Sequence, residues 1–512
     1  MKTTHWLLLL ALIPCSLQAQ VWQQGFEPAI WLRAADCGSQ PAVWSDLSGQ
    51  GHHALLLDSV PPDTVQFNYH PAFLLDLSRP GFKIPYLPNP NGKYTYITVY
   101  RSADSATEQG IWNIRLDSVQ TAGLTTQNLK SFSRKVPFAP VTSTTPVINA
   151  LFQSWLNRQA DTANCFLLVG ANDTLGFTGK LAEFLLFDKR LTDKVNARVH
   201  TVLALRYGIT LYEMPYVAGN DTIIWSWDSE AEYHNEVAGI GSDTLLGICQ
   251  KQSAGDGGDA AVAIAAGTLH PAHNLNPATM PQGCFLVWGH NHKALAPIIP
   301  DTLPGAAPFI PGCMQRVWLV RATGNGAAAL PTQVVYRPQP TDTLPVTTLV
   351  IDRQARATFH PDSVEFFYPD SVDAAGNVYF NAILWDTDLS GSDAFTFLFP
   401  WQQQQSTAKK TNITLTSGHN TPAEKSAAVN ESPIQCRLYP NPTPNHYHLV
   451  IELPETADAR ATLADPTGKQ IAEYRLSGSN RYTIEGSLQN KGVYLVTVYH
   501  KGKAAGYRLL VY

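Results

Sequence analysis

The chain has 512 residues and a formal net charge of −5, from 36 Lys and Arg against 41 Asp and Glu. Its basic residues form no block, so the composition offers no electrostatic footprint for nucleic acid, and we expect no nucleic-acid partner. Aromatic residues make up 10% of the chain, with 36 Pro and 35 Gly. These values favour a secreted all-β protein, and the length suggests about three domains.

The first residues predict an export signal. Lys2 precedes an apolar run at residues 6–14, and small or polar residues follow up to Ala19. This order is that of a secretory signal peptide, so we expect residues 1–19 to be removed after Ala19 and the protein to pass through the periplasm. The run is too short to span a bilayer, and no later stretch reaches about 18 apolar residues. We therefore expect no transmembrane segment.

Six cysteines remain when Cys15 is subtracted from the seven of the full chain: Cys37, Cys165, Cys249, Cys284, Cys313 and Cys436. An exported protein meets an oxidising compartment, which permits disulfides. We expect Cys37 to pair with Cys165, and Cys284 with Cys313. The alternative is that several are buried free thiols. No Cys-x-x-Cys pair occurs, which argues against a zinc ribbon or a thioredoxin-like site.

Residues 20–212 are predicted to form the first domain. Aromatic and β-branched residues favour strands at 29–36, 94–100, 165–170 and 181–187. The loop at 43–54 contains Trp44, Asp46, Ser48, Gly49, Gly51 and Ala54, and a later strand begins Gly-Lys-Leu-Ala-Glu at 179–183. Both segments resemble the concanavalin-like (laminin-G-like) jelly-roll of bacterial surface proteins. The resemblance implies a jelly-roll β-sandwich.

The same resemblance implies candidate sites in this domain. Domains of this kind often hold a structural Ca²⁺ near the early loop, which makes Asp46 a candidate metal ligand; the alternative is a turn capped by the Asp46 carboxylate. Trp31, Trp44, His52 and His53 are candidates for stacking on a glycan, although both tryptophans also suit a core. The fold also hosts glycosidases, but the strand at 181–187 offers Glu183 as its single carboxylate.

A helix is predicted at residues 192–207. Thr192 suits the N-cap position, and Val195, Val199, Val202 and Leu203 recur at helical spacing. Arg206 lies in the last turn, where a cation suits the helix dipole, and Gly208 is a natural left-handed stop. We expect this amphipathic helix to pack on the jelly-roll.

Residues 213–401 are predicted to form a second β-sandwich-like domain. The segments 222–228, 233–243, 250–253, 285–291 and 316–318 resemble an uncharacterised β-rich domain that follows the jelly-roll in type IX secretion cargo. The resemblance implies architecture and no activity. Because Gly239-Ile240-Gly241 does not open a helix, we interpret it as a turn and not as a dinucleotide-binding loop. The sequence around Asp352 lacks the Asp-rich turn that such domains often have, so no acidic site is expected there.

Two stretches of this domain have metal-ligand residues at close spacing. His290 and His292 follow a strand and could share one face, but no third ligand lies at a recognisable spacing. Residues 386–393 place Asp at alternate positions, as in a calcium loop, without the Glu that completes one. In both places the favoured interpretation is a polar loop without metal.

Residues 402–433, which are rich in Gln, Ser, Thr and Ala, are predicted to be a flexible linker. Residues 434–512 follow with alternating strands and a type I turn at 465–469. The motif residues are Tyr439, Pro440, Asn441, Pro442, Gly468, Lys469, Gly492, Tyr494 and Arg508. This set resembles the C-terminal sorting domain (type A) of type IX secretion substrates, with Arg508 where such tails often have Lys. The resemblance implies a small Ig-like β-sandwich that is recognised by the type IX secretion machinery.

No nucleophile elbow, metalloprotease helix or phosphate-binding loop occurs in the sequence. We therefore expect no enzyme activity. The favoured function is that of a secreted or cell-surface protein, carbohydrate-binding or adhesin-like, with a glycan or another surface component as partner. The alternatives are an extracellular polysaccharide hydrolase with a carboxylate pair on the jelly-roll, and a purely structural surface protein.

Overall fold

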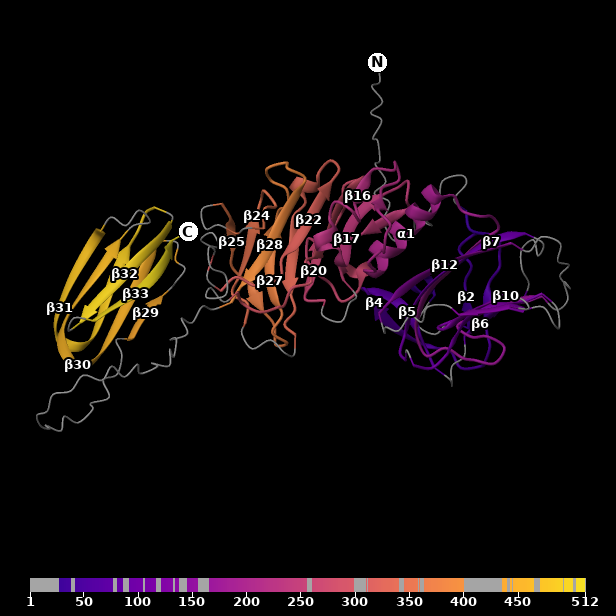
Figure 1. Cartoon of the computed structure of the whole chain (residues 1–512), viewed down its shortest axis with the longest axis horizontal. Coiled ribbons are helices and arrows are strands. Elements are labelled where there is room, and N and C mark those ends of the chain that lie inside the picture. Colours follow the sequence, from indigo (N-terminus) through magenta and orange to yellow (C-terminus); the bar gives the residue numbers. More distant parts are fainter. Residues whose placement is uncertain are drawn as a thin grey trace, which may run out of the picture. The chain divides into compact units, whose positions relative to one another are not determined.

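The computed structural model describes residues 27–399 and 435–511, except for 38–41, 77–80, 86–91, 105, 117–120, 132–133, 138–144, 155–164, 256–259, 299–309, 311, 340–344, 358, 360–362, 440–442, 444, 465–469, 491 and 501–502. It divides between Gln405 and Ser406 into two compact units (Figure 1). Strands dominate both units, and the described residues contain one α-helix, which confirms the all-β class. The predicted signal peptide and linker lie outside the described residues.

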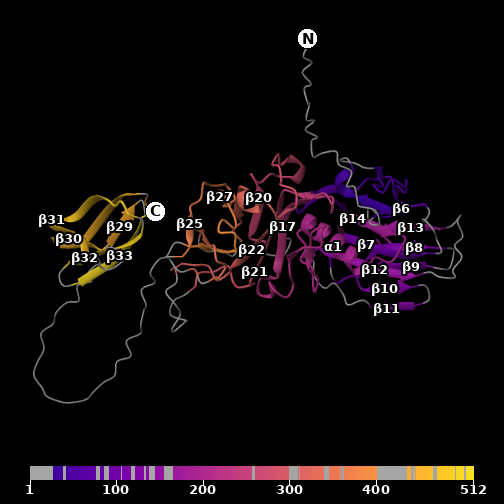
Figure 2. The same ribbon diagram turned by 90° about the horizontal axis from the view of Figure 1, so that it is seen from above.

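The first domain is a sandwich of two antiparallel sheets. Sheet A has the order β12-β7-β14-β5-β4, with β1 also on β14. Its strands are β1 (Ile30–Arg33), β4 (Asp63–Phe67), β5 (His70–Leu75), β7 (Lys93–Ser102), β12 (Val147–Ser154) and β14 (Gly179–Phe187). Sheet B has the order β11-β10-β9-β8-β13-β6-β3-β2, which Figure 2 shows on the right. Its strands are β2 (Val43–Trp44), β3 (Ala54–Leu56), β6 (Phe82–Ile84), β8 (Gly110–Arg115), β9 (Thr121–Thr125), β10 (Asn128–Ser131), β11 (Arg134–Pro137) and β13 (Phe166–Val169). Trp44, Phe73 and Trp112 lie in the core between the sheets.

The predicted helix is present as α1 (Asp193–Tyr207). The Thr192 side chain accepts a hydrogen bond from the Val195 amide, and Gly208 ends the helix with a φ of 67°. Val199, Val202 and Leu203 are fully buried. Both ends of the helix therefore follow from local sequence, as the capping residues predict.

The second domain is also a sandwich of two antiparallel sheets. Sheet C has the order β18-β17-β21-β22-β28-β24-β25, and sheet D the order β19-β20-β23-β27-β26. The strands of sheet C are β17 (Asn235–Asp243), β18 (Ile248–Gln250), β21 (Cys284–His290), β22 (Trp318–Thr323), β24 (Thr348–Asp352), β25 (Glu365–Phe367) and β28 (Ser392–Leu398). Those of sheet D are β19 (Gln252–Ala254), β20 (Val262–Ala266), β23 (Thr332–Tyr336), β26 (Ser371–Val372) and β27 (Val378–Ile383). A separate pair is formed by β15 (Tyr216–Val217) and β16 (Ile223–Trp225). The second domain also contains the short 3₁₀ helices η2 (Ala231–Tyr233), η3 (His273–Leu275) and η5 (Ala327–Ala329), and η1 (Ala34–Asp36) lies in the first domain.

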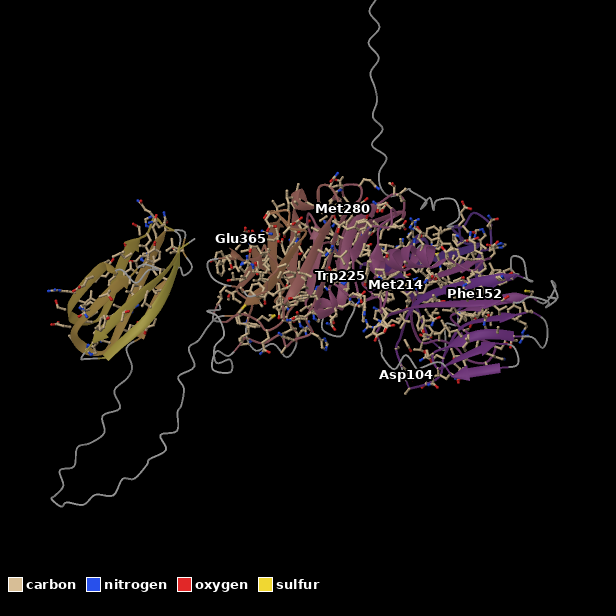
Figure 3. The ribbon with its side chains drawn as sticks, turned by 45° about the horizontal axis from the view of Figure 1, so that its top comes forward. Asp104, Phe152, Met214, Trp225, Met280 and Glu365 are labelled. Carbon is tan, nitrogen blue, oxygen red and sulfur yellow. The ribbon has the colours of Figure 1, made fainter. Side chains whose placement is uncertain are left out.

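Helix α1 is shared by the two sandwiches. Its buried face packs with Ile97 and Leu185 of sheet A and with Val287 of sheet C in one apolar cluster. Figure 2 shows α1 between β7 and β17, and Figure 3 labels Met214 and Trp225 at this junction. The helix therefore joins the two domains, which is more than the predicted packing on the jelly-roll alone.

The interpretation of Gly239-Ile240-Gly241 as a turn was wrong, because these residues lie inside β17. A Cβ atom on Gly239 would stand 2.7 Å from Leu205 Cδ2 of α1. A Cβ atom on Gly241 would stand 2.2 Å from the Phe285 ring. Both distances are below van der Waals contact, so these glycines permit close packing inside a strand.

A hairpin tip also fastens the first domain to the second. Asn68 and Tyr69, both at positive φ, form the two-residue turn between β4 and β5. Asn68 Nδ2 donates to the Arg206 carbonyl at 3.0 Å and to Ser253 Oγ at 2.9 Å. The Ala254 amide donates to Asn68 Oδ1 at 2.9 Å. One asparagine thus contacts both the helix end and sheet D.

The C-terminal unit contains β29 (Gln435–Tyr439), β30 (His446–Ala464), β31 (Gln470–Ser487), β32 (Gly492–His500) and β33 (Lys503–Val511). The long β30 pairs along one edge with β31 and along the other with β29 and then β32. A bridge between Thr443 and Val511 brings the two ends of the sheet together around one core. The last two strands, β32 and β33, pair as an antiparallel hairpin, while the predicted turn at 465–469 lies outside the described residues.

The predicted disulfides were wrong. Cys37, Cys284 and Cys313 are free cysteines, so neither the Cys37–Cys165 nor the Cys284–Cys313 pair forms. Cys284 and Cys313 are buried, and burial raises the pKa of both thiols, to about 11 for Cys284. They act as small apolar core residues, which was the alternative interpretation. Among the described residues, no helix is long and apolar enough to cross a membrane.

Candidate functional site

The Asp46 carboxylate caps its own loop. Oδ1 accepts the amides of Trp31 (2.9 Å) and Ser48 (3.0 Å), and Oδ2 accepts the Ser48 hydroxyl (2.7 Å) and the His52 amide (2.8 Å). The Asp46 amide in turn donates to His53 Nδ1 at 3.0 Å. Four donors occupy the lone pairs that a cation would need, so this geometry favours the capped turn over a Ca²⁺ ligand.

The predicted stacking residues do not form an open platform. Trp31 and Trp44 are buried, with Trp44 packed against Phe73 and Phe82 in the core of the jelly-roll. His52 is buried too, and burial lowers its pKa. These side chains hold the early loop against the sandwich, as the core interpretation predicts.

Glu183 lies in a closed cluster of donors. Its carboxylate accepts Trp31 Nε1 at 2.7 Å, Tyr207 Oη at 2.8 Å, and Arg206 Nη1 at 3.0 and 2.7 Å. Glu183 is 0% exposed and the Arg206 side chain 4%. A carboxylate that is buried and saturated in this way cannot reach a polysaccharide. Glu183 therefore joins β14 to α1 and is not available as a member of the carboxylate pair that the hydrolase alternative requires.

The metal candidates of the second domain form polar loops. His290 is buried, and its Nδ1 accepts the His292 amide at 2.9 Å. Asp386 Oδ1 accepts the Gly391 amide at 2.6 Å, and Asp393 Oδ2 accepts Arg353 Nη1 at 2.8 Å. Burial raises the pKa of Asp393 to about 6 despite this arginine. Within the described residues, no group of three His, Cys, Asp or Glu could hold a metal ion.

The outward face of sheet B carries a row of polar and aromatic side chains. Phe82 and Ile84 of β6 point into the core, so Lys83 between them points outward; the same alternation places Arg115 and Phe166 outward. Lys83 Nζ lies 4.4 Å and Arg115 Cζ 5.2 Å from the centre of the Phe166 ring. Arg115 also pairs with Asp173 at 3.1 Å. Two cations thus flank one ring on the outward face of sheet B.

Asn113 lies on the same face, next to Gly123 and Leu168 in register. It is 3% exposed, and its Nδ2 has no acceptor among the described residues. Gly123 provides room for this amide, because a Cβ atom there would stand 2.8 Å from Asn113 Oδ1. Buried amide donors normally have partners, so this amide is an exception within the fold. The two cations around Phe166 mark the outward face of sheet B as the candidate ligand site.

Of the sorting-motif residues, Gly492, Tyr494 and Arg508 lie on β32 and β33. Tyr494 is buried and donates to the Asn490 carbonyl at 2.8 Å. The Tyr439 backbone ends β29, whereas Pro440, Asn441, Pro442, Gly468 and Lys469 lie outside the described residues. Tyr494 therefore helps to fix the start of β32.

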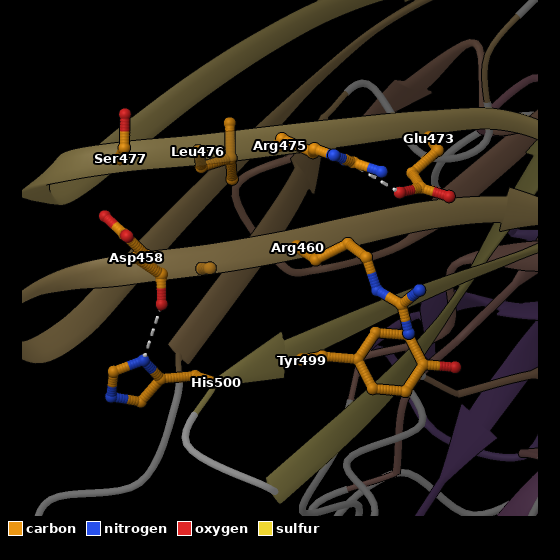
Figure 4. A pocket seen from close by; sticks show the side chains of 9 residues that line it. Asp458, Arg460, Glu473, Arg475, Leu476, Ser477, Tyr499 and His500 are labelled. Carbon is orange, nitrogen blue, oxygen red and sulfur yellow. Dashed lines mark hydrogen bonds and ion pairs between the residues drawn. The ribbon is translucent and has the colours of Figure 1, made fainter.

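The C-terminal unit also has a cavity of about 460 Å³ at the middle of β30 (Figure 4). Arg460 lies over the Tyr499 ring at 4.4 Å, and His500 Nδ1 lies 3.2 Å from the Asp458 carbonyl. Arg475 and Glu473 pair with each other at 3.3 Å on the opposite rim. Acidic and basic groups alternate around this cavity, which gives it no preference for one charge.

These features define a β protein whose C-terminal β unit is separate from the two sandwiches. Residues 437–511 match the family described as "Secretion system C-terminal sorting domain". The protein is therefore a secreted one, directed to the cell surface or the medium by contact with type IX secretion machinery. Residues 195–388 match a "Domain of unknown function (DUF8202)". This match begins inside α1, so it includes most of the helix together with the second domain.

No curated protein matches this chain. Among solved structures, a Trypanosoma rangeli sialidase in complex with the inhibitor DANA is 12% identical, over 32% of this chain and 31% of the sialidase, with a TM-score of 0.25. Domain 4 of AbnA, an arabinanase from Geobacillus stearothermophilus in complex with arabinotriose, is 13% identical, over 32% of this chain and 94% of that one, with a TM-score of 0.26. Latent PorU from Porphyromonas gingivalis is 9% identical, over 83% of this chain and 30% of PorU, with a TM-score of 0.14. The chain spans less than a third of the sialidase.

The sequence analysis missed Lys83, Asn113, Arg115 and Phe166. A signal was present in β8, where Asn113 and Arg115 alternate with the apolar Trp112 and Ile114. Such alternation marks polar residues as outward-facing. It does not show which strands are neighbours, and β6, β8 and β13 come together only through the sheet order.

Proposed function

We propose that this protein binds an acidic glycan on the outward face of sheet B once it has been exported. The observation that carries the proposal is the arrangement of Lys83 and Arg115 around Phe166 on this face. A carboxylate or sulfate of the glycan can form charge-assisted hydrogen bonds with both cations. The role is one of binding or adhesion, without catalysis.

The test uses the mature protein and immobilised acidic polysaccharides, pectate and heparin, with neutral dextran for comparison. The Lys83→Ala and Arg115→Ala variants should lose at least about tenfold in affinity for the acidic polymers, since each removes one charged contact. Lys93→Ala is the matched control, because Lys93 is an exposed lysine on β7 of the other sheet. Equal retention of the wild type and the two variants would overturn the proposal.

Export by the C-terminal unit has its own test. Deleting residues 507–512 removes most of the paired length of β33 and leaves the β32 edge open. The truncated protein should accumulate in the periplasm, measured by cell fractionation and immunoblotting. Normal amounts at the cell surface or in the medium would show that the last strand is not required.

A further inference from the structure

The second domain exposes two aromatic side chains beside the end of α1. Tyr212 is 75% exposed, more than other large aromatic side chains among the described residues. Its ring centre lies 4.7 Å from that of Trp227, at an angle of 63°. Trp227 is half-buried and packs in turn against His234, at 4.2 Å and 74°. We call Tyr212 and Trp227 the aromatic platform.

The segment that carries Tyr212 is fixed by buried side chains. The Leu211 amide donates to Tyr216 Oη at 3.0 Å, and the Leu211 carbonyl accepts from His234 Nε2. Directly after Tyr212, Glu213 has a φ of 49°, an uncommon value for a residue other than glycine. The amide and the carbonyl of Leu211 are therefore both hydrogen-bonded, and the backbone turns at Glu213, directly after Tyr212.

The loop that carries Trp227 is equally constrained. The Glu230 carboxylate accepts the Ser226 amide at 2.7 Å through one oxygen and Arg321 Nη1 of β22 at 2.7 Å through the other. Beneath Trp227, His234 Nδ1 accepts Trp225 Nε1 at 3.0 Å. Burial lowers the pKa of His234, so its ring stays neutral in this arrangement.

A preorganised, solvent-facing pair of rings is the usual anchor of a binding surface. Tyr and Trp offer large contact areas with few rotatable bonds, so little conformational entropy is lost when a ligand stacks on them. Packing alone does not require Tyr212, because most of its ring faces solvent. The exposed residues Glu213, Asp228 and Ser229 flank the platform in sequence and present hydrogen-bond acceptors.

We infer that the aromatic platform is a second binding site, for a neutral glycan. The apolar C–H face of a pyranose stacks on an aromatic ring, and its hydroxyls donate to carboxylates such as those of Glu213 and Asp228. The flanking carboxylates would repel an acidic sugar. This inference rests on the proposed role in glycan binding. The platform, however, uses residues on another domain and selects a neutral glycan in place of an acidic one.

The experiment measures binding of the mature full-length protein to short neutral oligosaccharides of glucose, mannose and galactose, by titration calorimetry at low and high salt. Tyr212→Ala and Trp227→Ala should each weaken binding by at least about tenfold, as for an aromatic anchor. Phe152→Ala is the matched control, because Phe152 is an exposed aromatic residue of the jelly-roll. Because Trp227 also covers His234, melting curves establish that the variants are folded, and Tyr212→Ala tests the site without removing that cover.

Two further outcomes separate this site from the one on sheet B. Neutral-glycan binding that survives Lys83→Ala but not Tyr212→Ala supports the platform, whatever happens with acidic polymers. Absence of neutral-glycan binding in a wild type that still binds pectate overturns the platform alone. Binding of a lysine-rich peptide that weakens with salt and with Tyr212→Ala, without binding of oligosaccharides, would show that the platform selects cations and overturn the inference.

Discussion

The Glu183 cluster and the aromatic platform use the same kinds of residue for opposite purposes. In the Glu183 cluster, Trp31 and Tyr207 turn their polar groups inward to one buried carboxylate. In the platform, Tyr212 and Trp227 pack against each other, and most of the Tyr212 side chain faces solvent. An inward cluster couples domains, whereas an outward one is available to a ligand. Changes to the first should therefore alter stability, and changes to the second should alter binding.

The largest effect is expected from Arg206→Leu. This change removes the arginine that is hydrogen-bonded to the buried Glu183 carboxylate, which typically costs about 3–5 kcal/mol in the free energy of unfolding. Arg198→Leu is the matched control on the same helix, because Arg198 pairs with the partly exposed Asp221, and such pairs contribute about 1 kcal/mol or less. Chemical denaturation of both variants measures the difference. Equal losses would mean that the buried pair does not couple the domains.

A slightly smaller effect is expected from Val199→Asp. Val199 is fully buried in the apolar cluster shared by α1 and the two sandwiches. A carboxylate at this position has no partner, so unfolding should require about 3 kcal/mol less free energy. Asn196→Asp introduces the same charge at a partly exposed position of α1 and should leave the melting temperature nearly unchanged. An unchanged melting temperature for Val199→Asp would contradict the shared core.

The inward region should also respond to acid. His70 and His273 stack at 4.5 Å where the β4–β5 hairpin meets the second domain. Burial, with Lys251 and Arg206 nearby, lowers the pKa of His273 from 6.5 to about 4, and burial lowers that of His70 well below 6.5. The folded state thus binds fewer protons than the unfolded state between pH 6.5 and 4.

Stability should consequently be complete above pH 6.5 and fall as the pH drops toward 4, by up to about 1.4 kcal/mol per pH unit for each histidine. Denaturation curves across this range measure the slope. His273→Gln should reduce the slope, whereas His292→Gln, at an exposed position, should leave it unchanged. A slope that is the same in His273→Gln would show that other groups control the acid response.

The contrast also shows how far sequence can predict this molecule. Thr192 and Gly208 define α1 because capping depends on neighbouring residues. Gly239 was misinterpreted because its reason, the approach of Leu205, comes from the packing of a helix on a distant strand. Glu183 and Asp46 were recognised as notable, but their partners lie elsewhere in the chain and decide their roles. Tyr212 and Trp227 were not predicted as site residues, since exposure of an aromatic side chain depends on the tertiary fold.

The smallest effect expected here is that of calcium on the first domain. The calcium hypothesis predicts that Ca²⁺ raises the melting temperature by linkage and that Asp46→Ala abolishes the rise. The structure instead predicts equal melting curves in Ca²⁺ and in chelator, because the four lone-pair positions of Asp46 accept hydrogen bonds from Trp31, Ser48 and His52. A cation would have to displace these donors and leave buried amides unpaired, at about 1–3 kcal/mol each. Asp46→Ala should still lower stability in both conditions, since the same amides then lose their acceptor. A rise in melting temperature that depends on both Ca²⁺ and Asp46 would contradict this prediction. It would show that the loop binds calcium and that it, like the platform, is a ligand site.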